Sequence, residues 1–178
     1  ADQQAVLIRS FILNHYNLLT KSDLNVIIKI HSMPDFTFRR GERLKSRKVI
    51  EQLFKGGQSF AQYPLRIVWM EVAQPQSEFP AQFALSVSKK KFKRAVDRNR
   101  VRRLVREAYR LHKHSLYGGI TKERSSAHPE SSQIALMIIY TGTEILPFAA
   151  IEKAMRALLG RFVKKYGASN QNPGSETL

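Results

Sequence analysis

The residues with the clearest chemistry in this chain are arginines. The stretch AVDRNRVRRLVREAYR, residues 95–110, contains six arginines against one aspartate and one glutamate. A guanidinium group is a planar, permanently charged fork of N–H donors that matches two phosphate oxygens at once. The composition therefore indicates binding of phosphate groups.

The surrounding sequence concentrates the positive charge of the whole chain. Residues 86–113 hold twelve Lys and Arg residues and two acidic residues, a net charge of +10. The other 150 residues share the remaining +6 of the total of +16. A solvated helix face normally mixes both signs, with an acidic residue four positions before a basic one. A segment this one-sided is typical of a polyanion site.

The residues that usually carry catalysis form no such pattern. His112 and His114 are two positions apart, which places them on different sides of a helix, and no close carboxylate pair suits acid–base or two-metal chemistry. Neither a phosphate-binding P-loop nor a nucleophile elbow is present. The chain has no cysteine, which excludes disulfides and Cys-based zinc sites and permits a reducing compartment. We expect no catalytic and no metal-binding residue.

The arginines lie in a stretch with the apolar spacing of an amphipathic helix. The positions that recur at intervals of three and four are Val101, Leu104, Val105, Ala108 and Tyr109. That spacing predicts a helix over residues 98–110 whose apolar side packs on the core, with Asp97 as its N-cap. Asn99 and the arginines then form a ridge on the other side, which repels itself until an anionic partner neutralises it.

Periodicity and turn residues predict the elements that position this helix. Ser46 is the expected N-cap of a helix over 47–55, which Gly56 and Gly57 end because glycine accepts the left-handed conformation. Strands are expected at 65–73 and 82–88, near 59–62, and at 133–141, where a continuous apolar run predicts a central strand. Residues 117–132 are expected to form a loop, and a final helix begins at Thr143 or Glu144 with Pro147 in its first turn.

This order, α-β-β-β-α-β-α, predicts an α+β fold, a two-layer sandwich with helices packed on a small mixed sheet. Residues 33–166 are long enough for a single RNA-binding domain. Residues 167–178 have the composition of a disordered tail. Residues 1–32 are nearly neutral and are either an N-terminal extension outside the core fold or an amphipathic helix around 6–19. We see no secretory signal and no membrane span, and expect a cytoplasmic protein.

Two segments together resemble a known family. SVSKKKFKRAVDRNRVRRLVREAYR and the upstream FTFRRGERLKSRKVIEQLFKGGQSF are similar to the bacterial ribonuclease P protein subunit, and the resemblance extends from Phe36 to Lys165. It implies a ribonucleoprotein hydrolase, an endonuclease that removes the 5′ leader from precursor tRNA and whose RNA subunit cleaves the bond. It also implies a left-handed crossover around the basic helix, and Mg²⁺ held mainly by the RNA.

The resemblance implies partners and site residues. The partners are the catalytic RNA and precursor tRNA, with no membrane and no required protein partner. The RNA-binding face corresponds to Lys89, Lys90, Lys91, Lys93, Arg94, Arg98, Asn99, Arg100, Arg102, Arg103 and Arg106. A cleft that binds the single-stranded leader corresponds to Ile50, Phe54, Arg66 and Val68.

The chain departs from the family in this cleft. Many members carry an aromatic residue at the position of Ile50, and one is known near that of Val68. Two alternatives follow: the contacts with the leader are weaker in this chain, or stacking comes from Phe54, Trp69 or Tyr63 instead. For Phe54 packing in the core is an equal alternative, and for Trp69 it is the favoured one.

Two other functions remain as alternatives. One is a basic RNA- or DNA-binding protein such as a ribosomal or nucleoid component. The other is a helix-turn-helix regulator with residues 98–110 as its recognition helix, which requires a short helix just upstream. The Lys-rich stretch at 88–94 has the composition of a turn after a strand, which argues against the regulator.

Overall fold

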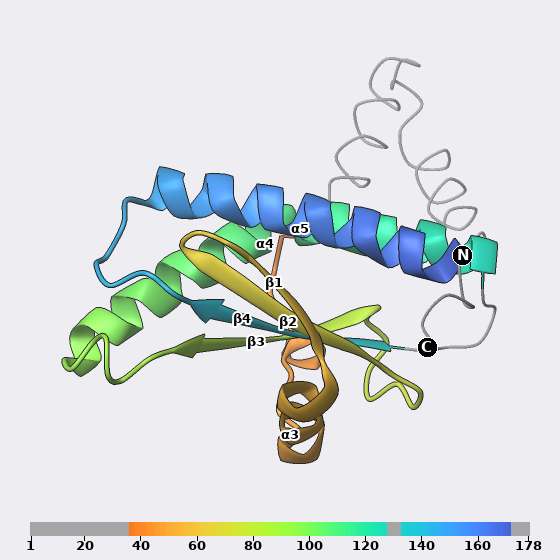
Figure 1. Ribbon diagram of the computed structural model, residues 1–178, viewed down its shortest axis with the longest axis horizontal. Coiled ribbons are helices and arrows are strands. Elements are labelled where there is room, and N and C mark those ends of the chain that lie inside the picture. Colours follow the sequence, from red (N-terminus) through yellow and green to blue (C-terminus); the bar gives the residue numbers. More distant parts are fainter. Residues whose placement is uncertain (1–35, 128–132, 172–178) are drawn as a thin grey trace, which may run out of the picture. The chain divides into compact units, whose positions relative to one another are not determined.

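A four-stranded mixed sheet with helices on both of its faces makes up residues 36–127 and 133–171, which the computed structural model describes (Figure 1). In chain order the elements are the 3-10 helix η1 (Arg40–Glu42), α3 (Arg47–Gly56), β1 (Gln58–Gln62), β2 (Leu65–Val72), β3 (Ala81–Val87), α4 (Ala95–Ala127), β4 (Gln133–Tyr140) and α5 (Phe148–Gln171). The predicted order α-β-β-β-α-β-α is confirmed. The predicted extension over 1–32 and the end of the predicted tail lie outside the described residues.

The strands lie in the order β1-β2-β4-β3. β2 pairs antiparallel with both β1 and β4, whereas β3 runs parallel to β4. β4 is therefore an interior strand, as its continuous apolar run predicts, and α4 is the crossover between the parallel neighbours β3 and β4. The handedness of that crossover stays a prediction.

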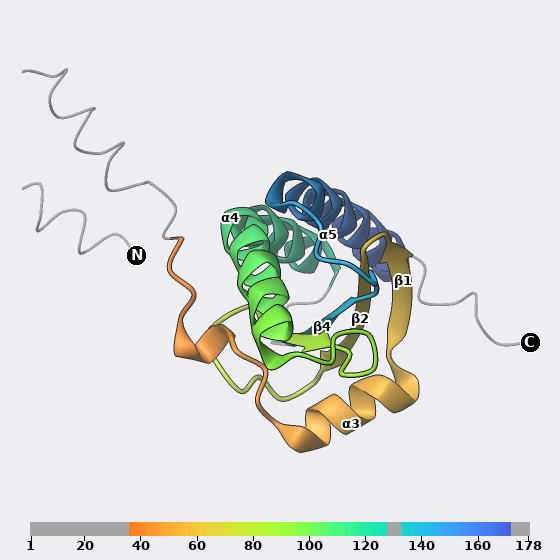
Figure 2. The same ribbon diagram turned by 90° about the vertical axis from the view of Figure 1, so that its left-hand side faces the viewer.

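The two faces of the sheet have different cover (Figure 2). α4 and α5 lie side by side over one face, where Leu65, Ile67 and Trp69 of β2 are buried. α3 lies across the other face and packs on Val68 of β2 and Met137 of β4. The alternation along β2 thus splits its side chains between two cores, and the prediction that Trp69 packs in a core is confirmed.

α3 begins as predicted and ends for a different reason. Ser46 is its N-cap, and the Ser46 hydroxyl accepts a hydrogen bond from the Val49 N–H at 3.5 Å. Gly57 follows the helix with φ −72°, so the prediction of a left-handed glycine is wrong. Gly57 is needed because a Cβ built there would collide with the Leu53 carbonyl oxygen.

α4 is much longer than its arginine-rich part, which corrects two predictions. The helix runs to Ala127, so residues 117–127 are not a loop, and it begins at Ala95, which places Asp97 inside the first turn instead of before it. Leu116 and Ile120 are fully buried and continue the apolar stripe of the helix. The packing gained along this stripe outweighs the weak helix propensity of the glycine pair at 118–119.

The glycine pair in α4 gives a matched test of helix packing. A Cβ at Gly119 would lie 2.5 Å from Cγ1 of Val163 on α5, whereas a Cβ at Gly118 meets nothing within 4 Å. We expect Gly118→Ala to stabilise the protein by about 0.5–1 kcal/mol through helix propensity. We expect Gly119→Ala to destabilise it by about 1–2 kcal/mol, because overpacking against the stiff Val163 exceeds that gain. Urea unfolding of both variants measures the difference, and equal effects would contradict close packing at Gly119.

The last helix, α5, begins later and ends later than the sequence predicts. Its first backbone hydrogen bonds run from the N–H groups of Ala150 and Ile151 to the Pro147 carbonyl, so Pro147 precedes the helix and neither Thr143 nor Glu144 opens it. Residues 167–171, predicted as part of the tail, continue it. Within the described part of the chain, no helix has the length and apolar character required to cross a membrane.

Candidate nucleic-acid interface

The predicted division of α4 into an apolar and a basic side is confirmed. Val101, Val105, Ala108 and Tyr109 are fully buried beneath the helix. The polar side chains that face away from the core at its N-terminal half are fully or partly exposed, and we call them the arginine ridge: Asn99, Arg100, Arg102, Arg103 and Arg106. Within the ridge, the Arg102 guanidinium donates to the Asn99 side-chain oxygen at 3.2 Å.

Two arginines of the same helix serve the protein itself. The Arg98 guanidinium donates to the backbone carbonyls of Phe92 and Lys93, at 2.9 and 2.6 Å. Arg98 therefore fixes the loop before α4, although the resemblance placed it on the RNA-binding face. Arg110 pairs with Glu107 at 2.6 Å, and this hydrogen bond holds the pKa of Glu107 below its usual value. The charge of Arg110 is thus largely offset.

Residues 88–94 join β3 to α4 and extend the basic surface. Phe92 is buried and anchors this loop, and the Lys91 ammonium donates to the Thr141 carbonyl. Lys91 is itself exposed, and the other exposed cations of the loop, which we call the lysine loop, are Lys89, Lys90, Lys93 and Arg94. Among the described residues no helix lies just upstream of α4, and three strands separate it from α3, so the helix-turn-helix alternative, against which the sequence already argued, is excluded.

The predicted leader-binding residues lie on α3 and β2, and they differ in exposure: three are accessible to a ligand and one is buried. Phe54 is 57% exposed, so the alternative that it packs in the core is wrong. Ile50 is partly exposed, and Arg66 is exposed and donates to the Ser59 hydroxyl at 2.7 Å. Val68 is only 7% exposed and packs under α3, so it supports the helix and offers a ligand little surface.

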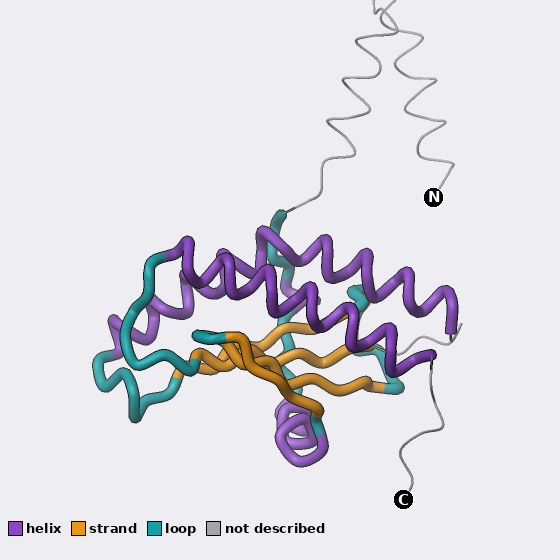
Figure 3. The backbone as a smooth tube through the Cα atoms, turned by 45° about the horizontal axis from the view of Figure 1, so that its top comes forward, coloured by secondary structure: helices purple, strands orange, loops and turns teal. Residues whose placement is uncertain are grey.

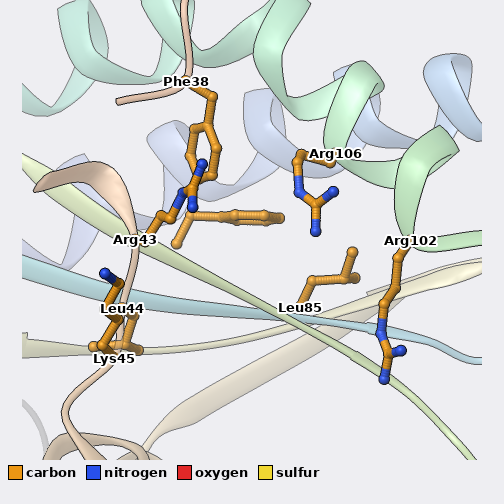
Figure 4. A pocket seen from close by; sticks show the side chains of 8 residues that line it. Phe38, Arg43, Leu44, Lys45, Leu85, Arg102 and Arg106 are labelled. Carbon is orange, nitrogen blue, oxygen red and sulfur yellow. The ribbon is translucent and has the colours of Figure 1, made fainter. Parts of the chain in front are cut away.

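Sequence reasoning missed a segment that the structure brings against α4. Residues 36–45 meet β3 at its outer edge, where Arg43 forms a parallel bridge with Phe83 and the Leu44 N–H donates to the Phe83 carbonyl at 2.9 Å. A cavity of 410 Å³ opens between this segment, β3 and the arginine ridge, with Arg43 and Lys45 on its wall (Figure 4). The run RRGERLK at 39–45 carries a visible charge signal, but nothing local in it indicates which part of the fold it contacts.

A buried ion pair fastens this segment to α4. Glu42 of η1 is fully buried and accepts from the Lys113 ammonium at 2.7 Å, from the Tyr117 hydroxyl at 3.1 Å and from the Arg39 N–H at 3.3 Å. Lys113 is 2% exposed and also donates to the Thr37 carbonyl. With all of these groups hydrogen-bonded, the pair holds the segment in one place along the helix.

The described residues do not offer a metal site. Across residues 36–127 and 133–171, no three His, Asp or Glu side chains come together in a way that could hold an ion. His112 and Glu152 meet at 3.3 Å, but as a pair that links α4 to α5. A single His–Glu pair does not fit a resident divalent cation. No side chain of the described residues is therefore assigned a part in metal-dependent catalysis.

The fold and the surface define the class as an α+β protein with a strongly basic face. The family model described as Ribonuclease P matches residues 38–163. The chain is 40% identical over 130 residues to the ribonuclease P protein component of Porphyromonas gingivalis strain W83, a match that covers 73% of this chain and 89% of that protein. It is 37% identical over 110 residues to the component of Chlorobium phaeobacteroides, covering 60% and 73%.

This chain belongs to the ribonuclease P protein family. It is a subunit of ribonuclease P, the ribozyme that acts as the endoribonuclease of tRNA 5′ maturation, and its membership implies partnership with the catalytic RNA. The alternative of a ribosomal or nucleoid component is thereby excluded.

Among solved structures, this chain is similar to the RNase P protein of Thermotoga maritima, with a TM-score of 0.49, 22% identity and coverage of 67% of this chain and 96% of that one. It is also similar to that of Staphylococcus aureus, with a TM-score of 0.47, 20% identity and coverage of 68% and 94%.

Proposed function

We propose that this subunit binds the catalytic RNA through the arginine ridge and the lysine loop, and the single-stranded 5′ leader of precursor tRNA through α3 and β2. The observation that carries the proposal is that two chemically different sets of exposed side chains belong to helices on opposite faces of one sheet. Figure 3 shows these helices, with α4 and α5 over one face and α3 over the other. The ridge and the loop present cations, which suit the phosphates of a folded RNA. The α3 side presents an exposed aromatic ring, Phe54, beside partly exposed Ile50.

The division of the surfaces has a physical reason. Two RNA molecules repel each other, and a chain of net charge +16 placed between them lowers that repulsion. A single-stranded leader has unpaired bases that can stack on a ring. Arg66 is exposed on β2 and, by strand alternation, points to the same face of the sheet as Val68 under α3, where it offers a cation to a phosphate. The subunit then raises the affinity for substrates that carry a leader, while the RNA cleaves the bond.

The leader surface predicts a defect that depends on leader length. In the reconstituted ribonucleoprotein, Phe54→Ala is expected to weaken binding of precursor tRNA with a leader of several nucleotides by about 5- to 150-fold, the contribution of one stacked base. Binding of a substrate with a single-nucleotide leader, or of mature tRNA, is expected to change little. Titration of substrate against the wild-type and variant complexes at each leader length measures the effect.

The control for this prediction is Gln52→Ala, which truncates an exposed side chain on the same helix. We expect no dependence on leader length for that variant. An equal loss at every leader length for Phe54→Ala, or a lowered melting temperature alone, would show that Phe54 does not bind the leader.

A further inference from the structure

The cavity beside the arginine ridge has walls of two kinds (Figure 4). On one side the rings of Phe38 and Phe83 meet edge to face, with centroids 5.8 Å apart, and Phe83 stacks on Tyr109 at 4.0 Å. Leu85 of β3 continues this apolar wall. Because Phe83 and Tyr109 are buried and stacked, the wall is rigid before any ligand arrives.

The other walls of the cavity carry four cations and no acidic residue. Arg43 and Lys45 come from the segment before α3, and Arg102 and Arg106 come from α4. The side chains of Lys45 and Arg106 make no hydrogen bond or ion pair with any residue of the described ranges, and the Arg43 guanidinium lies over the Phe38 ring at 5.5 Å. Four like charges around one cavity repel each other, so an anionic group between them is favoured.

The open edge of β3 adds hydrogen-bonding groups. The Phe83 backbone faces the outer edge of the sheet, because its carbonyl accepts from Leu44 there. Backbone direction alternates along a strand, so Leu85 presents its N–H and C=O to the same edge, where no described residue hydrogen-bonds to them. A donor and an acceptor beside an apolar wall are what the edge and the face of a nucleobase require.

We propose that this cavity binds one unstacked nucleotide of the catalytic RNA, with its base against Phe38 and Leu85 and its phosphates between the four cations. A phosphate ion would make no favourable contact with the apolar wall, and an apolar ligand would make none with the cations. A nucleotide has both an apolar base face and a phosphate, so it matches both walls. The volume of 410 Å³ lies within the range of about 300–1,000 Å³ for small-ligand pockets. The assignment to the catalytic RNA rests on the proposed function, because Arg102 and Arg106 belong to the ridge and lie across the sheet from Phe54.

The first test uses the full-length protein without any RNA partner, so its result does not depend on the proposed function. The probes are adenosine 5′-monophosphate, ribose 5-phosphate and inorganic phosphate, and binding is followed by backbone NMR shifts. We expect the nucleotide to bind at least about fivefold more tightly than ribose 5-phosphate, the lower end of what one stacked base contributes. The shifts are expected at residues 38–45, 83–85 and 102–106.

Two outcomes of this test would overturn the proposal. Equal affinities for the nucleotide and ribose 5-phosphate would leave an anion site without base binding. Shifts confined to α3 would place the base elsewhere.

Variants separate the two walls. Phe38→Leu keeps an apolar side chain but removes the ring, and is expected to abolish the preference for the nucleotide while ribose 5-phosphate still binds. Arg43→Ala alters an exposed side chain, retains the fold, and is expected to weaken binding of all three probes. The matched control is Arg161→Ala, because Arg161 lies over the Phe60 ring at 5.0 Å outside the cavity. An unchanged preference in Phe38→Leu, or a loss in Arg161→Ala equal to that in Arg43→Ala, would contradict the site.

The second test assigns the nucleotide to one of the two RNAs. Phe38→Leu is expected to weaken assembly with the catalytic RNA at least about fivefold, by the same factor with and without substrate and at every leader length. A loss that grows with leader length would move the nucleotide to the leader, and unchanged assembly would exclude the cavity from the complex. A failure of the proposed leader surface would be seen in a different measurement, the dependence of substrate affinity on leader length in Phe54→Ala.

Discussion

Replacing Lys113 by methionine is expected to lower the free energy of unfolding by about 3–5 kcal/mol. The variant fills nearly the same volume but leaves the Glu42 carboxylate buried without its counter-charge. The Tyr117 hydroxyl remains a donor to that carboxylate, since burial raises the pKa of Tyr117 far above neutral pH. This hydroxyl and the Arg39 N–H, which also donates to the carboxylate, are neutral and cannot replace an ammonium group at 2.7 Å. Urea denaturation at neutral pH measures the loss.

A double variant distinguishes loss of the pair from loss of packing. Glu42→Gln combined with Lys113→Met removes both charges and keeps an oxygen that accepts from Tyr117. We expect it to be more stable than Lys113→Met alone, because the unpaired buried charge is gone. Lys153→Met, at an exposed position of α5, is expected to change stability by less than about 0.5 kcal/mol. A double variant that loses the sum of both single effects would show that the two residues act independently.

The pair also matters for RNA binding, because it positions the segment that carries Arg43 and Lys45. Residues 36–45 contain one turn of 3-10 helix and contact β3 at Gln82 and Phe83. So short a segment has little stability of its own. We therefore expect the RNA affinity of Lys113→Met to fall together with its stability, although Lys113 lies below the surface.

The sequence predicts the helices and strands of this fold well where the spacing of apolar residues within the segment is enough to distinguish a helix from a strand. β2 alternates, β4 is apolar throughout and the arginine part of α4 repeats every three to four residues, and each adopts the predicted form. Prediction failed where a contact with a distant part of the chain determines the local structure. Gly118 and Gly119 suggest a break, but the close approach of Val163 to Gly119 and the burial of Leu116 and Ile120 keep the chain helical.

In the candidate site, too, the features set by local spacing could be predicted and those set by contacts between distant residues could not. The arginine ridge follows from spacing alone, because residues three and four apart share a helix face. The role of Arg98 does not follow, since it depends on carbonyls that a loop turns toward it. The cavity could not be predicted either. Phe38 and Phe83 are 45 residues apart, and two tertiary contacts bring them together: the ion pair of Glu42 with Lys113, and the hydrogen bond from the Leu44 N–H to the Phe83 carbonyl.

The largest functional effect is expected from the arginine ridge. Replacing Arg102, Arg103 and Arg106 together by alanine should weaken assembly with the catalytic RNA at least about tenfold at low salt. It should also make the dependence of log affinity on log salt shallower, by up to about 0.7–0.9 for each phosphate that the variant no longer neutralises. The fold should survive, because the buried side of the helix is carried by Val101, Val105 and their neighbours. Circular dichroism and melting verify this before affinity is measured.

A control with equal charge decides whether the position of the arginines matters or only their number. Lys153, Arg156 and Lys164 are exposed on α5, and their replacement by alanine removes the same three charges from the other helix on that face. If net charge alone attracted the RNA, both triple variants would lose the same affinity and the same salt slope. Direct binding at the ridge requires that the α4 variant lose clearly more of both. An unchanged slope in a folded α4 variant would mean that the arginines form a solvated face that the RNA does not touch.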